Sequence, residues 1–401
     1  MRALAPRERM EEAPAPSARR LKIVQMGPTA PKGGVSVVVT QLSAELARQG
    51  HDVLLIGDGG DRTGMVVEAG GRYVELPYGA NLRVLAGQVR RVRSLLRAFQ
   101  PDVIHVHGRA PSLLVRAAGF RPDWFTLHST HLTENVAWYD RGFVRRLLSP
   151  LGRRIFVLDP LAIGYLEKRL GVAAERIQVV RNGVDCEAFR PPSAVERREA
   201  RESFGLRPAD RVAAFVGRFH EHKNPQAVVR MAAAARDAGI IDLQVLMVGE
   251  GHLEAEVRAL AQALDVADRV HVFGWRNPLA AYLAADLFVM PSPFEGFGLA
   301  AAEALACGTP VLRTRTGGFE HMIVEGSTGW GCDPADERSF VEKALEVLAD
   351  RSTLEAMRPA CRRHAVENLS VANQARQTVD AYRAAALLRG ASRRAILGDR
   401  P

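Results

Sequence analysis

The chain has 401 residues, enough for two domains, and its 47% hydrophobic and 25% charged residues are ordinary for a soluble globular protein. No stretch approaches the roughly 18 to 20 uninterrupted apolar residues of a membrane-spanning helix, which argues against an integral membrane protein. The formal charge of +9 comes entirely from residues 1–188, which hold 27 Lys and Arg against 18 Asp and Glu. Either the first half meets a polyanionic surface, or the composition is simply rich in arginine.

The first 20 residues carry five arginines without a continuous apolar core, so we expect a disordered basic tail rather than a secretory signal. The four cysteines are widely scattered, with neither metal-ligand spacing nor the density of a disulfide framework. They are Cys186, Cys307, Cys332 and Cys361. We therefore expect a cytoplasmic protein.

From residue 21 onward, short apolar runs alternate with amphipathic stretches, a pattern typical of parallel α/β domains. Strands are predicted at 21–26, 53–56, 103–106, 125–128, 155–158 and 177–180, and helices at 36–49 and 82–99. These elements predict a first Rossmann-like domain over residues 21–188.

A second alternating series follows residues 186–208, which hold two prolines and many charges and are interpreted as a link without a strand. Strands are predicted at 212–216, 243–248, 270–273, 287–290 and 310–313, with helices at 226–238, 253–264, 299–306 and 339–349. The series predicts a second Rossmann-like domain over 189–374. Two such domains leave a cleft, and parallel sheets bind ligands at the carboxyl ends of their strands.

Two loops after predicted strands suit an anionic ligand. Gly33 and Gly34 stand directly before a helix, where paired glycines allow close backbone approach and free N–H groups can meet a phosphate. Arg218 and Lys223 place two cations in the loop after the strand at 212–216, where they could neutralise a diphosphate. Taken alone, a tight turn and a solvated basic loop explain these residues equally well.

The most informative loop is 291–299, Pro-Ser-Pro-Phe-Glu-Gly-Phe-Gly-Leu, which runs into an alanine-rich helix. Gly296 and Gly298 permit a tight turn, and the helix that follows directs its N–H groups back at the loop. Glu295 and Glu303 would lie about 12 Å apart if helix geometry held throughout. That separation suits two ends of an extended ligand better than a glycosidase pair of carboxylates.

Histidines follow two strands of the first domain. His128, with Ser129, Thr130 and His131 after it, is a candidate for hydrogen-bonding a substrate hydroxyl. His105 and His107 share one face of a strand, a spacing that also permits a metal pair, but no third ligand supports one. We expect no metal site.

Together these segments resemble the large retaining glycosyltransferase family 4, over roughly residues 21–382. The most specific piece is the Glu-x7-Glu pattern of Glu295 and Glu303 with Phe297-Gly298-Leu299 and the run Ala306-Cys307-Gly308-Thr309-Pro310. Supporting pieces are Gly33-Gly34, Gly217-Arg218, Lys223-Asn224 and Gly317-Gly318.

The resemblance implies the GT-B fold, two Rossmann-like domains facing across a cleft, with a C-terminal helix at about 375–401 crossing back onto the first domain. It implies that the second domain binds a nucleoside-diphosphate sugar, UDP favoured over GDP, without a required cofactor or metal. Arg218 and Lys223 would hold the diphosphate, Glu303 the ribose, Glu295 a donor-sugar hydroxyl, and the backbone of Gly296 to Leu299 the sugar and phosphates. His128 would touch the donor sugar, while Gly33 and Gly34 would close over the diphosphate.

Two positions depart from the family pattern. His321, after Glu320, stands where relatives often carry Glu, and Val157-Leu158-Asp159 replaces a frequent Val-Ser. Both departures leave the acceptor side open. For acceptor recognition we expect His107, Thr130, His131 and Trp138.

The expected function is therefore metal-independent, retaining transfer of a hexose or N-acetylhexosamine to a hydroxyl of a small natural-product core or of a cell-envelope glycan or lipid. The alternatives are a catalytically silent nucleotide-sugar-binding or membrane-docking homologue and a sugar-nucleotide epimerase. A dehydrogenase is disfavoured because neither half carries the dinucleotide fingerprint. No nucleic-acid partner is expected. The basic amphipathic stretch 82–99 either packs on the first sheet or rests peripherally on the inner membrane face.

Overall fold

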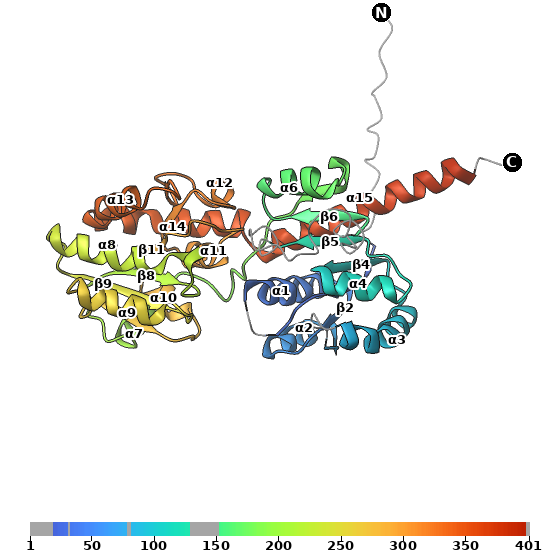
Figure 1. Cartoon of the computed structure of the whole chain (residues 1–401), viewed down its shortest axis with the longest axis horizontal. Helices are drawn as coiled ribbons and strands as arrows, with labels where there is room; N and C mark the ends of the chain where they lie inside the picture. Colours follow the sequence, from blue (N-terminus) through green and yellow to red (C-terminus); the bar gives the residue numbers. More distant parts are fainter. Residues whose placement is uncertain (1–18, 31–32, 78–81, 129–151, 398–401) are drawn as a thin grey trace, which may run out of the picture.

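The computed structural model describes residues 19–30, 33–77, 82–128 and 152–397. They form two lobes that lie side by side, each with a parallel sheet covered by helices (Figure 1). Strands between Lys22 and Val179 build the sheet of the first lobe, and strands between Arg211 and Cys332 build that of the second. The α/β class and the two Rossmann-like sheets predicted from the sequence are confirmed.

The first sheet has seven strands in the order β3-β2-β1-β4-β5-β6-β7, and all its pairs are parallel. Its strands are β1 Lys22–Met26, β2 Asp52–Gly57, β3 Arg72–Glu75, β4 Val103–His107, β5 Trp124–Leu127, β6 Arg154–Val157 and β7 Ile177–Val179. Its helices are α1 Gly34–Arg48, α2 Gly64–Glu68, α3 Leu82–Phe99, α4 Arg109–Ala117 and α6 Leu161–Leu170, with short 3-10 turns η1 Asp61–Thr63 and η4 Ala174–Arg176.

The second sheet has six parallel strands in the order β10-β9-β8-β11-β12-β13. Its strands are β8 Arg211–Val216, β9 Leu243–Val248, β10 Val270–Phe273, β11 Leu287–Met290, β12 Val311–Thr314 and β13 Gly329–Cys332. Its helices are α7 Ala194–Glu202, α8 Pro225–Asp237, α9 Glu254–Ala263, α10 Leu279–Ala284, α11 Leu299–Ala306, α12 Phe319–Met322, α13 Glu337–Ala349 and α14 Arg351–Asn368, with the 3-10 turn η5 Glu221–Lys223.

The inner strands of the first sheet, β1, β2, β4, β5 and β6, are buried on both faces, since their successive side chains point to opposite sides and both sets are largely buried. In β1, Val24 and Met26 join the core on one face and Ile23 joins the core on the other. Gln25 therefore lies on the same face as Ile23, as do His105 and His107 in β4. This alternation buries polar side chains beneath α1 and the C-terminal helix.

The C-terminal helix, α15 Val371–Leu397, packs against α1 of the first lobe although α14 before it belongs to the second (Figure 1). Val379, Tyr382 and Ala385 on α15 are buried in the core of the first lobe. A bridge between Val184 and Ser370 joins the two segments that run between the lobes.

The strands and helices predicted for the two sheets are observed within about two residues of their expected bounds, whereas several other elements, among them α2, α4, α6, α10, α12 and α14, were not predicted. The short edge strands β3 and β13 were not predicted, and α7 lies inside the segment interpreted as a link, where Ser193 and Glu196 form a reciprocal N-cap. Helix α11 begins at Leu299, as predicted. Glu295 therefore does not share a helix with Glu303, and the expected 12 Å helical separation does not apply.

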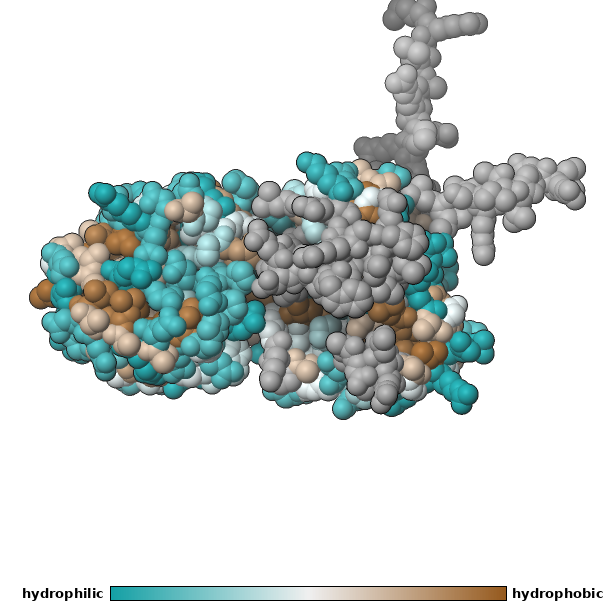
Figure 2. All heavy atoms as spheres, in the orientation of Figure 1, coloured by the Kyte–Doolittle hydropathy of each residue, from teal (hydrophilic) through white to brown (hydrophobic). Residues whose placement is uncertain are grey.

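Helix α3 buries the apolar face predicted for it: Val92, Leu96 and Phe99 enter the core, whereas Arg90, Arg91 and Arg97 are exposed. Two alternatives were open for this stretch, packing on the first sheet and contact with a membrane face. The structure shows the packing on the first sheet. Over the second lobe, hydrophobic and hydrophilic side chains are intermingled on the face drawn in Figure 2. Within the described part of the chain, no helix is both long and apolar enough to cross a membrane.

Candidate active site

The loop before α11 opens at the carboxyl edge of the second sheet. It follows β11, and its last residue, Gly298, adopts φ +92°, a conformation that favours glycine. The Glu295 carboxylate accepts a hydrogen bond from the Gly296 N–H at 3.0 Å. Backbone N–H groups at the start of α11 are oriented for an anion.

Glu295 pairs with Lys223, which lies on η5 after β8, so the two charged loops of the second lobe meet. Burial alone would raise the pKa of the Glu295 carboxyl, but the Lys223 ammonium, with Arg313 and the Gly296 N–H, lowers it below its ordinary value. Glu295 is therefore a carboxylate at neutral pH, held against a cation. The structure brings these two predicted site residues together.

Arg313 is a site residue that the sequence analysis missed. It lies in β12, its side chain is completely buried, and it donates hydrogen bonds to the carbonyl oxygens of Phe297 at 3.1 Å and Gly317 at 2.8 Å. Burial lowers the pKa of its guanidinium to about 10, against the opposing effect of Glu295 and Asp159. Arg313 thus fixes the loop of Phe297 to the loop of Gly317. Its one sequence signal is an arginine inside an otherwise apolar strand.

Glu303 lies on α11 and accepts a hydrogen bond from the Tyr282 hydroxyl at 2.7 Å. Burial raises the pKa of the Glu303 carboxyl to about 7, while this hydrogen bond and the charge of Arg62 act in the opposite direction. Near neutral pH the carboxyl is poised between its two forms. A pKa displaced this far in an alanine-rich helix is typical of a functional group.

Arg218 has an exposed side chain that makes no ion pair or hydrogen bond with any residue the structure describes. In the first lobe, Gly33 adopts φ +108° at the start of α1. A Cβ atom on Gly34 would come within 2.9 Å of Leu299 Cδ1, so the first lobe touches the start of α11 at this glycine. The N-termini of α1 and α11 therefore face one site from the two lobes.

His128 follows β5 and is connected to a buried polar network. Gln25 donates from its amide nitrogen to the Tyr382 hydroxyl at 3.1 Å, so its amide oxygen accepts from His107 Nε2 at 2.7 Å. His107 Nδ1 must then be the acceptor toward His128 Nε2, at 3.3 Å. Burial lowers the pKa of His107 well below its ordinary value, which keeps that imidazole neutral.

His105 continues the network: its Nδ1 lies 2.6 Å from the Tyr382 hydroxyl and its Nε2 lies 2.6 Å from Thr126 Oγ1. Both ring nitrogens are thus used, which gives no support to a His105–His107 metal pair. His107, expected on the acceptor side, is 2% exposed and lies behind His128. The other expected acceptor residues, Thr130, His131 and Trp138, lie outside the described residues.

The two departures from the family pattern fall close to one contact between the lobes. Asp159, after β6, accepts a hydrogen bond from the Gly318 N–H at 2.6 Å, at the start of α12. His321 on the same short helix approaches the Asn368 carbonyl oxygen at 3.3 Å. A carboxylate at a helix start is favourably placed for the helix dipole, so Asp159 helps hold the lobes together.

The arrangement can stabilise a leaving group that carries negative charge. Arg218, Lys223 and the N-termini of α1 and α11 are placed to neutralise it, and Glu303 offers an acceptor for hydroxyl groups. Among the described residues, a group of possible metal ligands outside this set is formed by His220, Glu221 and His252.

Comparisons with known proteins agree with this geometry. Residues 32–188 match the family described as Glycosyltransferase Family 4, and residues 196–364 match Glycosyl transferases group 1. The chain is 30% identical to D-inositol 3-phosphate glycosyltransferase 1 of Catenulispora acidiphila, over 83% of this chain and 86% of that protein. It is 27% identical to N-acetyl-alpha-D-glucosaminyl L-malate synthase of Bacillus anthracis, over 79% and 85%.

Solved structures share the fold. A glycosyltransferase from Rickettsia africae superposes with a TM-score of 0.76 at 18% identity, over 91% of this chain and 98% of that one. HepE from Anabaena, solved in complex with UDP and glucose, superposes with a TM-score of 0.75 at 16% identity, over 90% and 99%.

Proposed function

This chain belongs to glycosyltransferase family 4 and has the GT-B fold, and from that premise we propose that it transfers a hexose or N-acetylhexosamine from a UDP-sugar to a hydroxyl of a small polar acceptor, with retention of anomeric configuration. The names of two relatives support a small acceptor, since they specify inositol phosphate and malate. The complex of HepE with UDP and glucose supports the donor. The buried apolar face of α3 favours this acceptor over a lipid-linked one.

The observation that carries the proposal is the meeting of Lys223 and Glu295 at the start of α11, opposite Gly34 of the first lobe. As the bond between the anomeric carbon and the diphosphate oxygen breaks, negative charge grows on that oxygen. Arg218, Lys223 and the N–H groups of α11 stabilise it. The acceptor oxygen bonds to the anomeric carbon on the same face, and its proton passes to the departing diphosphate.

The remaining residues position the two substrates. Glu303 accepts hydrogen bonds from the ribose hydroxyls, and Glu295 accepts one from a hydroxyl of the donor sugar. The backbone N–H groups of Gly296 to Leu299 donate to the sugar and phosphates. Gly33 and Gly34 close over the diphosphate from the first lobe, while His128 touches the donor sugar. We further propose that His107 acts through His128, and that Thr130, His131 and Trp138 contact the acceptor.

We propose that this transfer needs no catalytic metal, because the fixed cations and helix N-termini supply the positive charge at the diphosphate. We also place the enzyme in the cytoplasm. The four cysteines are free and buried in the structure, as suits a reducing compartment.

The first test is a thermal-shift titration of the purified protein with UDP, GDP and NAD, without added metal. A ligand at 100 times its dissociation constant adds about 2.7 kcal/mol to the free energy of unfolding, a clear upward shift of Tm. We expect UDP to stabilise the parent protein and the Glu303→Ala and Lys223→Ala variants to lose that response. Glu342→Ala, an exposed glutamate on α13, is the control that should keep it.

Stabilisation by NAD alone would contradict the proposal, and stabilisation by GDP but not UDP would correct the donor base. With UDP binding shown, release of UDP from UDP-glucose and UDP-N-acetylglucosamine is then measured against panels of inositol phosphates and hydroxy acids. An enzyme that binds UDP but releases none with any of these acceptors would contradict the small polar acceptor.

A further inference from the structure

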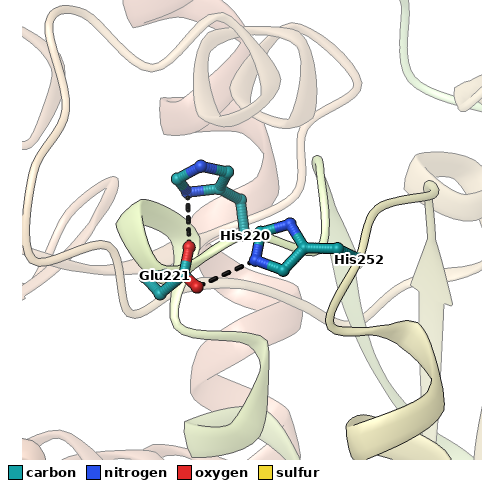
Figure 3. Close-up of side chains that lie close together, drawn as sticks. All are labelled: His220, Glu221 and His252. Carbon is teal, nitrogen blue, oxygen red and sulfur yellow. Dashed lines mark hydrogen bonds and ion pairs between the residues drawn. The ribbon is translucent and has the colours of Figure 1, made fainter.

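Two loops at the carboxyl edge of the second sheet place three metal-ligating side chains together. His220 and Glu221 lie in the loop after β8, and His252 lies in the loop after β9 (Figure 3). One Glu221 oxygen lies 3.0 Å from His220 Nδ1, and the other lies 2.8 Å from His252 Nε2. The carboxylate thus sits between two imidazoles that come from different loops.

The spacing fits a small divalent cation. All three candidate ligand atoms lie within 4.8 Å of one another. Bonds of about 2.0 to 2.1 Å in a tetrahedral site place ligand atoms about 3.4 Å apart. A cation that replaces the two hydrogen bonds of Glu221 therefore needs only small side-chain movements.

Backbone hydrogen bonds hold the two loops next to each other, so the main chains that carry the three side chains are already positioned. The Phe219 N–H donates to the Glu250 carbonyl oxygen at 2.9 Å, and the Leu253 N–H donates to the Phe219 carbonyl oxygen at 3.2 Å. Gly251, at φ +158°, passes so close that a Cβ atom would lie 2.3 Å from the Phe219 oxygen. The residues that flank His220 and His252 are thereby fixed to each other.

The side chains are accessible to a cation and its water. The exposed fractions are 37% for His220, 63% for Glu221 and 57% for His252. Two imidazoles and a carboxylate are a ligand set that Zn²⁺ accepts, with water in the fourth position. Cation binding through His220 Nδ1 would displace one weak hydrogen bond, which this atom accepts from the His222 N–H at 3.3 Å.

We propose that His220, Glu221 and His252 form a binding site for a divalent transition-metal cation, Zn²⁺ in the first place. The cation is separate from the reacting groups and takes no part in bond breaking. It cross-links the loop that carries Arg218 and Lys223 to the loop after β9. Its occupancy therefore stiffens the basic loop of the candidate active site.

The test measures Zn²⁺ binding to the full chain, prepared without a histidine tag and stripped with chelator, at pH 7.5 and without nucleotide. Competition against a chromogenic chelator gives stoichiometry and affinity. We expect one tight equivalent in the parent and at least about tenfold weaker binding in His220→Ala and His252→Ala, because loss of even an outer partner of a metal ligand costs about 10- to 100-fold. His222→Ala is the matched control: its ring stacks on His220, with the centroids 4.8 Å apart, but it is not one of the three ligands, so this variant should bind within about twofold of the parent.

Folding is checked separately, by the Tm of each variant in excess chelator, which should match the parent because the three side chains are exposed. In addition, Co²⁺ should give the parent an intense tetrahedral absorption band that His252→Ala lacks. Absence of a stoichiometric Zn²⁺ site in the parent, or equal affinity in His252→Ala, overturns the proposal. Either result leaves the UDP titration untouched, so the two proposals fail independently.

Discussion

The carboxyl of Glu303 makes the stability of the protein depend on pH in a direction that is unusual for an acid. Its pKa in the folded state is raised to about 7 by burial, above the ordinary 4.5. The folded protein therefore favours the protonated form, and this stabilisation is complete below pH 4.5 and lost as the pH rises through 7. We expect Glu303→Gln to gain about 3 kcal/mol in free energy of unfolding relative to the parent between pH 4.5 and 8.

Urea unfolding of both proteins at several pH values measures this difference. Glu342→Gln, on the exposed surface of α13, is the control and should run parallel to the parent. A constant difference between Glu303→Gln and the parent across that range would show that the carboxyl is ionised in the folded state throughout.

The pair of Lys223 and Glu295 should be strongly coupled, because each of its members leaves an uncompensated charge when the other is removed. A double-mutant cycle with Lys223→Ala and Glu295→Ala should give a coupling of about 2 kcal/mol in the free energy of unfolding. The exposed pair of Arg338 and Glu342 is the reference and should show no measurable coupling. Equal coupling in the two cycles would mean that solvent screens the Lys223–Glu295 pair.

At this scale, the sequence predicted candidate site residues that stand in contiguous loops and missed candidates defined by distant contacts. Glu295, Gly296 and Gly298 are recognisable because the turn and the helix start lie in one segment. Tyr282 becomes a partner of Glu303, and Arg313 a clamp on the Phe297 loop, only when separate strands and helices are assembled. Nothing in the local pattern around Arg313 shows which carbonyl groups it will meet.

Helix α15 and strand β4 are joined by the hydroxyl of Tyr382, which contacts both Gln25 and His105. Tyr382→Phe leaves these two buried groups without that partner. We expect it to cost about 1 to 3 kcal/mol in free energy of unfolding. Tyr165→Phe is a matched control in the same lobe, since the Tyr165 hydroxyl has no hydrogen-bond partner among the residues that the structure describes, and it should be nearly neutral.

The same substitution reports on His128 through Gln25 and His107. Loss of the Tyr382 hydroxyl frees the Gln25 amide to turn, which would exchange the donor and acceptor atoms along the network. Once an acceptor is known, Tyr382→Phe should change the pH profile of the transfer reaction, while Tyr165→Phe should not. An unaltered profile would restrict the network to stability.

Elements with strong hydrophobic periodicity were predicted within a residue or two, as for β9 and α3. The edge strands β3 and β13 were not, because Arg72–Glu75 and Gly329–Cys332 are only four residues long and partly exposed. Helix α7 was missed for a different reason: its nine residues are mainly charged, and its start depends on side-chain capping by Ser193 and Glu196. Periodicity carries little information about such elements.

At the scale of the whole molecule, the contact between Asp159 and Gly318 connects the first lobe to the second. Asp159→Ala should weaken the association of the two lobes by about tenfold, as expected for the loss of a charge-assisted hydrogen bond. Asp159→Asn retains an acceptor oxygen without the charge and should fall between the parent and the alanine variant. Small-angle scattering would show a larger radius of gyration for the alanine variant, and an unchanged radius would show that other contacts suffice.

The lobes are joined by two covalent passages of the chain, one before α7 and one between α14 and α15, and these passages are fastened to each other. The Val184 N–H donates to the Leu369 carbonyl oxygen at 2.8 Å, and the Val371 N–H donates to the Val184 carbonyl oxygen at 2.9 Å. A Cβ atom on Gly183 would lie 2.5 Å from the Val371 backbone, so the two passages are in direct contact there. The connection between the lobes is therefore two chain segments wide, and hydrogen bonds tie the two segments together. We therefore expect a single proteolytic cut in either passage to leave the two lobes attached, because the other passage still joins them.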